Sequence, residues 1–301
     1  MWTQASRPEG RRSGRFRIIK EVAQRTSVAA GETLCVHRWR AQDQRPERVL
    51  VFFHGALSHG ARHGEMFEWL IQRSQGNLEV RALDLLGHGL SSGTRSHVAK
   101  FSHWTEDALG LVREVAETSA AVTVLGHSLG GLIALKLAID HEAQLPTAVR
   151  GLALSNPCVK PIQVVDFPHA ETVLNTVADK MPSLRYPRFH KGLQLVSDPE
   201  AANAFETDPL VSHFITAQMT REIWYGSQEL RGLSYFLRRP SLFLLSDEDY
   251  VVDREASLLF SRGIDRRLVQ VIEYSNARHE LLHEKARQQV WSDLASWMEK
   301  L

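Results

Sequence analysis

One five-residue pattern, with a different kind of sequence on each side, constrains this chain more than any other feature. Residues 122–125 are β-branched or aliphatic and predict a buried strand, whereas the residues after Ser128 predict a helix with small residues on its inner side. Between them lies a G-x-S-x-G pattern, from Gly126 to Gly130. The two glycines suit a sharp strand-to-helix turn, because a side chain there would clash. This order predicts Ser128 as a nucleophile presented outward; a serine that only caps the helix is the alternative.

The composition is typical of one large α/β domain that carries an insertion. The chain has 301 residues, of which 43% are hydrophobic and 24% are charged. Its formal net charge of +1 gives no electrostatic reason to expect a nucleic-acid partner. With only Cys35 and Cys158, it is not a disulfide-stapled secreted scaffold. Because we find neither a membrane-span pattern nor an apolar signal core, we expect a cytoplasmic protein and leave peripheral membrane contact open.

Strand and helix patterns alternate along most of the chain. Residues 17–27 and 32–39 predict an antiparallel hairpin at the sheet edge, and the apolar run at 48–53 predicts a central strand. The alternation predicts a mostly parallel, doubly wound sheet. Residues 1–15 lack a hydrophobic period, so we expect a flexible N-terminal tail. Further strands are expected at 78–83, 149–155, 241–245 and 268–272, and helices at 66–75, 101–118 and 254–262 and through Trp291 and Trp297.

The alternation stops between residues 158 and 219. This stretch holds several prolines and scattered aromatic residues without a strand pattern, so we predict a helical cap inserted over the carboxyl edge of the sheet. The core then comprises residues 16–157 and 220–301. The apolar residues of the cap need burial or a ligand, and exposed ones would suit an acyl chain or a lipid surface. They are Val164, Val165, Phe167, Val173, Leu174, Val177 and Leu184.

Two backbone N–H groups are predicted to form an oxyanion hole. His54-Gly55-Ala56 follows a central strand, where the glycine lets the chain turn and leaves the Ala56 N–H free for an anion. The second N–H is that of Leu129, the residue after the nucleophile. An ordinary strand-to-helix loop is the alternative. We interpret His54 as a side chain that braces this loop from beneath.

Four acidic residues follow the strand at 241–245 and compete as the partner of a catalytic base. We choose Asp249, because Asp253 is placed to cap the helix at 254–262 and Asp247 lies closer to the strand end. The fourth acid is Glu248.

The sequence from His279 to His283 satisfies the zinc pattern H-E-x-x-H. In zinc proteases both histidines lie within one helix and a third ligand follows downstream. Here the pair lies at a loop-to-helix boundary, in a chain that already has a serine in its own turn. We therefore predict His279 as the general base and His283 as a surface or bracing residue, with no metal.

The glycine-rich stretch from Asp84 to Gly93 matches a dinucleotide-binding pattern only loosely. Gly87, Gly89 and Gly93 have the wrong spacing, and no helix pattern begins directly after them. We interpret the stretch as a tight surface turn braced by Asp84, without a nucleotide cofactor.

Together these motifs resemble the monoacylglycerol lipase and lysophospholipase branch of the α/β-hydrolases, which is often grouped with serine aminopeptidase-like hydrolases. The resemblance runs from about Arg48 to the C-terminus, apart from the cap interior. It implies Ser128 as nucleophile, Asp249 and His279 as its partners, and Ala56 and Leu129 as oxyanion amides. It rests on His54-Gly55-Ala56, Asp84 with Gly87-His88-Gly89 and Ser91, Gly126 to Gly131, Asp208 to Leu210, Asp249 to Asp253, and His279 to Leu282.

The resemblance implies a serine hydrolase that cleaves the ester of a monoacylglycerol or lysophospholipid through an acyl-enzyme, without a metal or organic cofactor. The same triad could serve a peptidase or a thioesterase. A hydrolase-like protein that only binds a ligand is the remaining alternative, against which the intact serine, acid and histidine argue. The sequence does not predict an oligomeric state.

Overall fold

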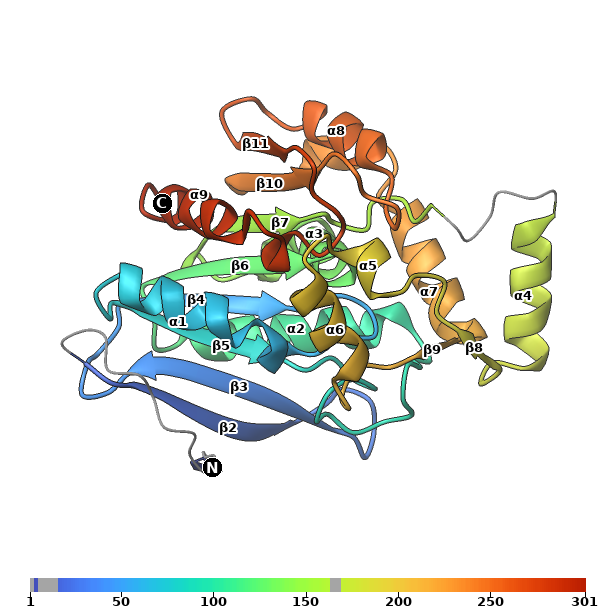
Figure 1. Ribbon diagram of the computed structural model, residues 1–301, viewed down its shortest axis with the longest axis horizontal. Coiled ribbons are helices and arrows are strands. Elements are labelled where there is room, and N and C mark those ends of the chain that lie inside the picture. Colours follow the sequence, from blue (N-terminus) through green and yellow to red (C-terminus); the bar gives the residue numbers. More distant parts are fainter. Residues whose placement is uncertain (1–2, 5–15, 163–168) are drawn as a thin grey trace.

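The computed structural model describes residues 3–4, 16–162 and 169–301. All described strands except β8 and β9 form one large sheet, with its parallel part from β5 to β11 and antiparallel pairs at β1, β2 and β3 (Figure 1). This is the mostly parallel sheet predicted. Its strand order is β1 (Thr3–Gln4), β2 (Ile18–Thr26), β3 (Thr33–Ala41), β5 (Leu78–Leu83), β4 (Arg48–Phe53), β6 (Ala121–His127), β7 (Val149–Ser155), β10 (Ser241–Ser246) and β11 (Val269–Tyr274).

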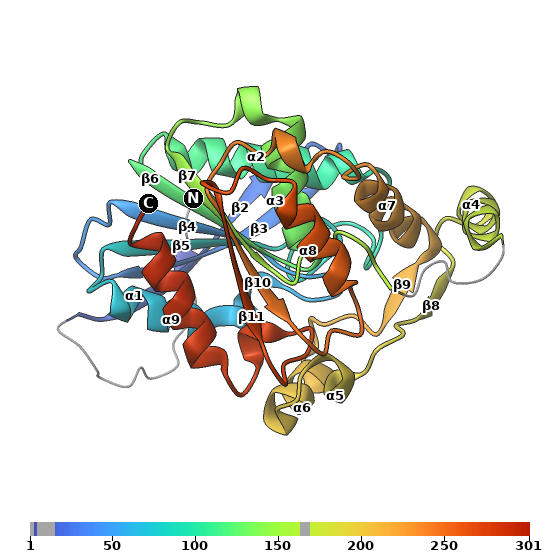
Figure 2. The ribbon, with the colours of Figure 1, turned by 90° about the horizontal axis from the view of Figure 1, so that it is seen from above.

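Helices cover both faces of the sheet, which confirms the doubly wound arrangement (Figure 2). Helices α1 (Gly64–Arg73) and α9 (Arg287–Met298) pack on one face, and α2 (Phe101–Ala116), α3 (Leu129–Asp140) and α8 (Arg254–Arg262) pack on the other. The sheet has a hydrophobic core on each face, and β4 contributes side chains to both. Val51 and Phe53 face α2 and α3, whereas Leu50 and Phe52 face α1 and α9. Burial on both faces explains why the sequence of this strand is a nearly continuous apolar run.

The first strands form the antiparallel hairpin expected from the sequence. β2 pairs with β3 from Ile18 opposite Ala41 to Thr26 opposite Thr33. Thr3 and Gln4 pair with β2, so these two residues of the expected flexible tail form strand β1 instead. The rest of that prediction lies outside the described residues.

The segment from 158 to 219 contains helices, as predicted, and a small antiparallel pair of strands that the sequence pattern missed. Strands of three residues are too short to carry a periodic signal. The predicted boundary at residue 219 falls inside α7 (Ala217–Gln228), which packs against α2, α3 and α4. The elements before α7 are α4 (Ala170–Lys180), β8 (Arg185–Pro187), α5 (Gly192–Leu195), α6 (Pro199–Thr207) and β9 (Phe214–Thr216).

Helix α4 projects from the body of the molecule, with α7 as its neighbour (Figures 1 and 2). Its apolar residues are only partly covered: Val173 is 49% exposed, and Leu184, just beyond the helix, is 40% exposed. The predicted cap residues Val164, Val165 and Phe167 lie outside the described part of the chain. None of the described helices combines the length and the apolar character that crossing a bilayer requires.

Candidate active site

Ser128 lies at the junction where β6 ends and α3 begins. Its backbone has φ +52° and ψ −115°, a conformation that residues with a side chain rarely adopt. A Cβ atom on Gly130 would lie 2.0 Å from the carbonyl oxygen of Phe53, and one on Gly126 would lie 2.2 Å from the carbonyl oxygen of Gly130. The close approach of β4 and α3 to this turn is therefore possible only with glycine on both sides of the serine.

The backbone strain at Ser128 predicts that glycine is the more stable replacement. A residue with a side chain in such a conformation costs about 1–3 kcal/mol, part of which the greater chain entropy of glycine offsets. We expect Ser128→Gly to exceed Ser128→Ala in free energy of unfolding by about 1 kcal/mol, measured by urea denaturation. Equal stability of the two variants would show that the turn is unstrained.

Ser128, His279 and Asp249 form one hydrogen-bonded chain across three loops. Nε2 of His279 lies 2.9 Å from Oγ of Ser128, and Nδ1 lies 2.8 Å from Oδ2 of Asp249. The loops follow β6, β10 and β11, whose carboxyl ends meet at one edge of the sheet. Because an ionised carboxylate only accepts hydrogen bonds, Nδ1 carries the hydrogen and Nε2 is free to accept the hydroxyl proton of the serine.

Among the four acids after β10, Asp249 alone contacts the histidine. Its Oδ1 accepts the N–H groups of Val251 and Val252 at 2.8 and 3.0 Å, which leaves Oδ2 directed at His279. Asp253 caps α8, as predicted, by accepting the N–H of Ala256. The other two acids contact the loop after β11: Asp247 accepts the N–H of Ala277, and Glu248 pairs with Arg278.

The surroundings of His279 stabilise its charged form. Burial by itself would lower the pKa of His279, but the charge and hydrogen bond of Asp249, with a contribution from Glu280, raise it above 6.5. Ser128 and His279 are both buried, at 6% and 4% exposed. A positive charge on His279 would therefore be compensated inside the protein.

The loop that holds Ala56 lies beside Ser128. A Cβ atom on Gly55 would lie 3.3 Å from Cβ of Ser128, so this loop and the serine turn are in contact. Leu129 is the first residue of α3, where a helix leaves its N–H groups unpaired. Within the described residues, neither the Ala56 nor the Leu129 N–H donates a hydrogen bond. Both amides are available to an anion beside Ser128.

His54 braces this loop from beneath, as the sequence predicted. Its Nδ1 donates to the carbonyl oxygen of Gly55 at 2.7 Å, and its Nε2 accepts the N–H of Leu85 at 3.0 Å. Burial is the largest of the effects that lower the pKa of His54 to about 3, so the ring stays neutral. It joins the ends of β4 and β5.

Comparisons with known proteins identify the family and the fold of this chain. The sequence profile of the serine aminopeptidase S33 family matches residues 44–286, which is most of the chain. The chain belongs to this family. Its fold is that of the α/β-hydrolases: a solved monoglyceride lipase of Saccharomyces cerevisiae superposes with a TM-score of 0.79, at 19% identity, over 94% of this chain and 95% of that one.

Curated relatives of this S33 hydrolase include lipases of similar length. It is 28% identical over 260 residues to a monoacylglycerol lipase of Mycolicibacterium smegmatis, covering 85% of this chain and 89% of that protein. It is 26% identical over 263 residues to a phospholipase of Bacillus subtilis, covering 84% and 95%. It also matches an uncharacterized abhydrolase domain-containing protein of Dictyostelium discoideum, of whose length it spans 28%.

The two histidines of the H-E-x-x-H sequence in this S33 hydrolase have separate partners. His279 contacts Ser128 and Asp249, whereas Nε2 of His283 lies 3.0 Å from Nδ1 of His63. His283 is half-buried and lies in the 3-10 helix η4 (Leu281–His283). Of the two roles predicted for it, the bracing role is the one that fits.

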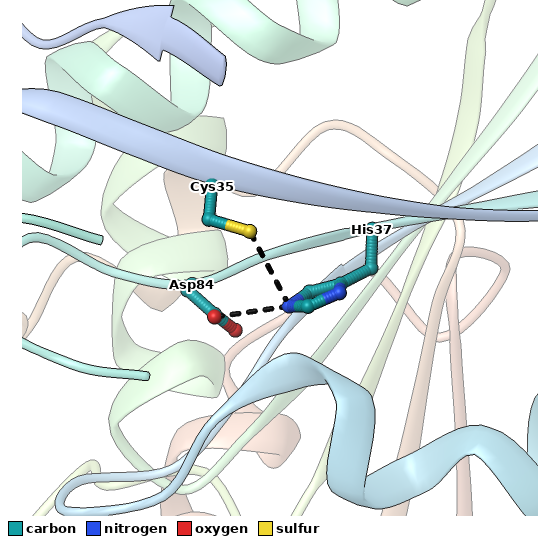
Figure 3. A group of neighbouring side chains, drawn as sticks. All are labelled: Cys35, His37 and Asp84. Carbon is teal, nitrogen blue, oxygen red and sulfur yellow. Dashed lines mark hydrogen bonds and ion pairs between the residues drawn. The ribbon is translucent and has the colours of Figure 1, made fainter. Parts of the chain in front are cut away.

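The side chains of Cys35, His37 and Asp84 form a buried cluster (Figure 3). The Cys35 Sγ and an Asp84 oxygen both approach Nε2 of His37, at 3.6 and 3.0 Å. Asp84 also accepts the N–H groups of Gly60 and Leu90, and burial, then Asp84, raises the pKa of the Cys35 thiol to about 12. A metal would need a thiolate and free carboxylate oxygens, so this donor set fits a structural role better.

The cluster corrects one prediction about the glycine-rich loop after β5. Asp84 braces the loop, as expected, but most of the loop is buried and not at the surface. The reason is that Asp84 ties three segments together: strand β3 through His37, the turn at Gly60, and its own loop at Leu90.

Asn156 is a site residue that the sequence interpretation missed. Its side-chain nitrogen donates to the carbonyl oxygen of His279 and to Oγ of Ser246, both at 2.8 Å, and its oxygen accepts the Ser246 N–H. It thereby joins the end of β7 to β10 and to the loop of the base. The only sequence signal was the break in alternation at Asn156-Pro157.

Proposed function

We propose that this carboxylic ester hydrolase cleaves a monoacylglycerol or a lysophospholipid through Ser128, His279, Asp249 and an acyl-enzyme. The observation that carries the proposal is the hydrogen-bonded chain from Asp249 through His279 to Ser128. Relatives named monoacylglycerol lipase and phospholipase support the choice of substrate class.

The reaction follows from the chemistry of these groups. Oγ of Ser128 attacks the ester carbonyl while Nε2 of His279 takes its proton, and Asp249 stabilises the imidazolium. The amides of Ala56 and Leu129 donate to the oxyanion, each contributing about 3 kcal/mol to transition-state stabilisation. His279 then gives the proton to the leaving alcohol. Water, activated in the same way, releases the acyl group and restores the serine.

The cap is proposed to decide which ester reaches Ser128. Residues of the cap bond directly to the loops of Ala56, Asp249 and His279: Ser212 N–H to Leu57, Ile162 N–H to Val251, and the carbonyl of Leu195 to the N–H of Glu280. The cap carries exposed apolar residues that suit an acyl chain or a lipid surface. These are Val173, Met181, Leu184, Phe189 and Leu193.

Substrate profiling tests the proposal. We expect higher kcat/KM for 1-acylglycerols and lysophosphatidylcholines than for a matched acyl p-nitroanilide or acyl-CoA, because relatives of this chain are named monoacylglycerol lipase and phospholipase. Each rate is measured beside Ser128→Ala, which corrects for background hydrolysis. Preference for an aminoacyl amide would instead support a peptidase, and preference for the thioester would support a thioesterase. In either case the lipid-ester assignment fails.

A further inference from the structure

A buried chain of polar side chains lies behind the catalytic base. The ring of His279 packs against that of His127, with centroids 5.0 Å apart and planes inclined by 46°. Nε2 of His127 lies 3.3 Å from Oε1 of Glu280, and the guanidinium of Arg62 donates to the other oxygen of this carboxylate. His127 immediately precedes Ser128 in the sequence, and Glu280 immediately follows His279. Arg62 comes from the 3-10 helix η1 (Gly60–His63).

Glu280 carries a permanent negative charge beside the base. Burial by itself would raise the pKa of Glu280, but the charge of Arg62 and the hydrogen bond from His127 hold it well below its usual value. The Arg62 and Glu280 side chains are each only 6% exposed. A buried ion pair of this kind contributes little net stability compared with apolar residues of the same size. Its location against the catalytic histidine therefore suggests a role in the reaction.

Asp208 interacts with Arg62 and Arg287 acts on His283, whereas the two histidines next to the pair are uncharged. His63 and His283 bond to each other, and burial lowers the pKa of both well below 6.5, so they stay neutral. Burial, then His279, also lowers the pKa of His190 in the cap, whose Nδ1 is buried without a partner among the described residues. Glu280 and Asp249 are thus the two carboxylates that act on His279.

We propose that the Arg62–Glu280 ion pair is a positioning device for His279: it fixes the ring of His127 against which His279 packs, and it holds a second negative charge beside the base. The proposal rests on the proposed function of Ser128 and His279. The carboxylate accepts the Nε2 hydrogen of His127, while Nδ1 of His127 accepts the hydroxyl hydrogen of Ser155 at 3.3 Å. Because both of its ring nitrogens are hydrogen-bonded, His127 presents a fixed ring surface against which His279 packs.

The two parts of this role can be separated by substitutions at one residue. Glu280→Gln removes the charge but keeps the shape, whereas Glu280→Asp keeps the charge but shortens the reach to His127. Glu284→Gln is the matched control, since Glu284 is a buried carboxylate of the same loop that bonds to Ser197 and to the N–H of Arg278. The measured quantity is the rate of labelling by a fluorophosphonate probe as a function of pH.

In Glu280→Gln, the acidic limb of the labelling profile is expected to move to lower pH by on the order of one unit, because a charge that favours the imidazolium is lost. The plateau is expected to fall by up to about a hundredfold, because the ring of His279 is less well held. Glu280→Asp should keep the limb of the wild type and lower only the plateau. Glu284→Gln should leave the limb where it is.

A paired variant guards against loss of folding. Glu280→Gln leaves Arg62 buried without its partner, so Arg62→Gln/Glu280→Gln is measured beside it and should show the same shift. The inference is overturned if the acidic limb is unchanged in both variants, or if both fail to fold while Glu284→Gln folds. Either result would mean that the ion pair only stabilises the fold. Absence of labelling in the wild type would instead overturn the proposed function, and the inference with it.

Discussion

Ser128→Ala is expected to lower kcat/KM for ester hydrolysis by roughly 10⁴-fold or more, because no other group can form the acyl-enzyme. Oγ of Ser128 is the atom that Nε2 of His279 contacts at 2.9 Å. Neither cysteine can replace it: burial is the main cause that raises the pKa of both Cys35 and Cys158 to about 12, so both stay protonated. The measurement is steady-state hydrolysis of a 1-acylglycerol.

The loss must come from chemistry and not from unfolding. Ser128 contributes only a small polar side chain to a preformed turn, so Ser128→Ala should keep the circular dichroism and urea midpoint of the wild type within experimental error. Substantial remaining hydrolysis by the folded variant would mean that another nucleophile, or a serine elsewhere, carries the reaction.

Asp249→Asn is expected to lower kcat/KM by roughly 10³- to 10⁴-fold and to move its acidic limb to lower pH. Hydrolysis needs neutral His279, and the wild-type pKa of His279 is raised above 6.5 mainly by Asp249, against the opposing effect of burial. Without that carboxylate, burial dominates and the pKa falls. The residual activity of the variant should therefore persist at more acidic pH than that of the wild type.

Asp253→Asn is the matched control for this variant. Asp253 caps α8 and pairs with Lys160 without reaching His279, and asparagine is as good a helix cap as aspartate. Its kcat/KM and acidic limb should stay close to those of the wild type. A larger loss in Asp253→Asn than in Asp249→Asn would move the role of the acid to residue 253.

The sheet could be predicted because its central strands are buried on both faces. Residues 49–53 are an unbroken apolar run and residues 121–125 a nearly continuous one, and the turns after them need glycines at positions that the pattern shows directly. The candidate triad could be predicted for a related reason. In a parallel sheet, loops after neighbouring strands meet at one edge, so Ser128, Asp249 and His279 were expected to converge.

The remaining features depend on contacts between distant segments. The β8–β9 pair is too short for a periodic signal, and the burial of the glycine-rich loop follows from His37 on another strand meeting Asp84. The pairing of Arg62 with Glu280 joins residues more than two hundred positions apart, and neither residue type indicates burial by itself. Such contacts become visible only once the chain is folded.

The most direct test of the account is the site of covalent modification. The wild-type protein is treated with a fluorophosphonate, digested, and analysed by mass spectrometry. The proposed mechanism predicts one stoichiometric adduct on the peptide that contains Ser128, absent from Ser128→Ala and strongly slowed in Asp249→Asn. An adduct on another residue, or an unmodified Ser128 in a folded protein that still hydrolyses esters, would contradict it.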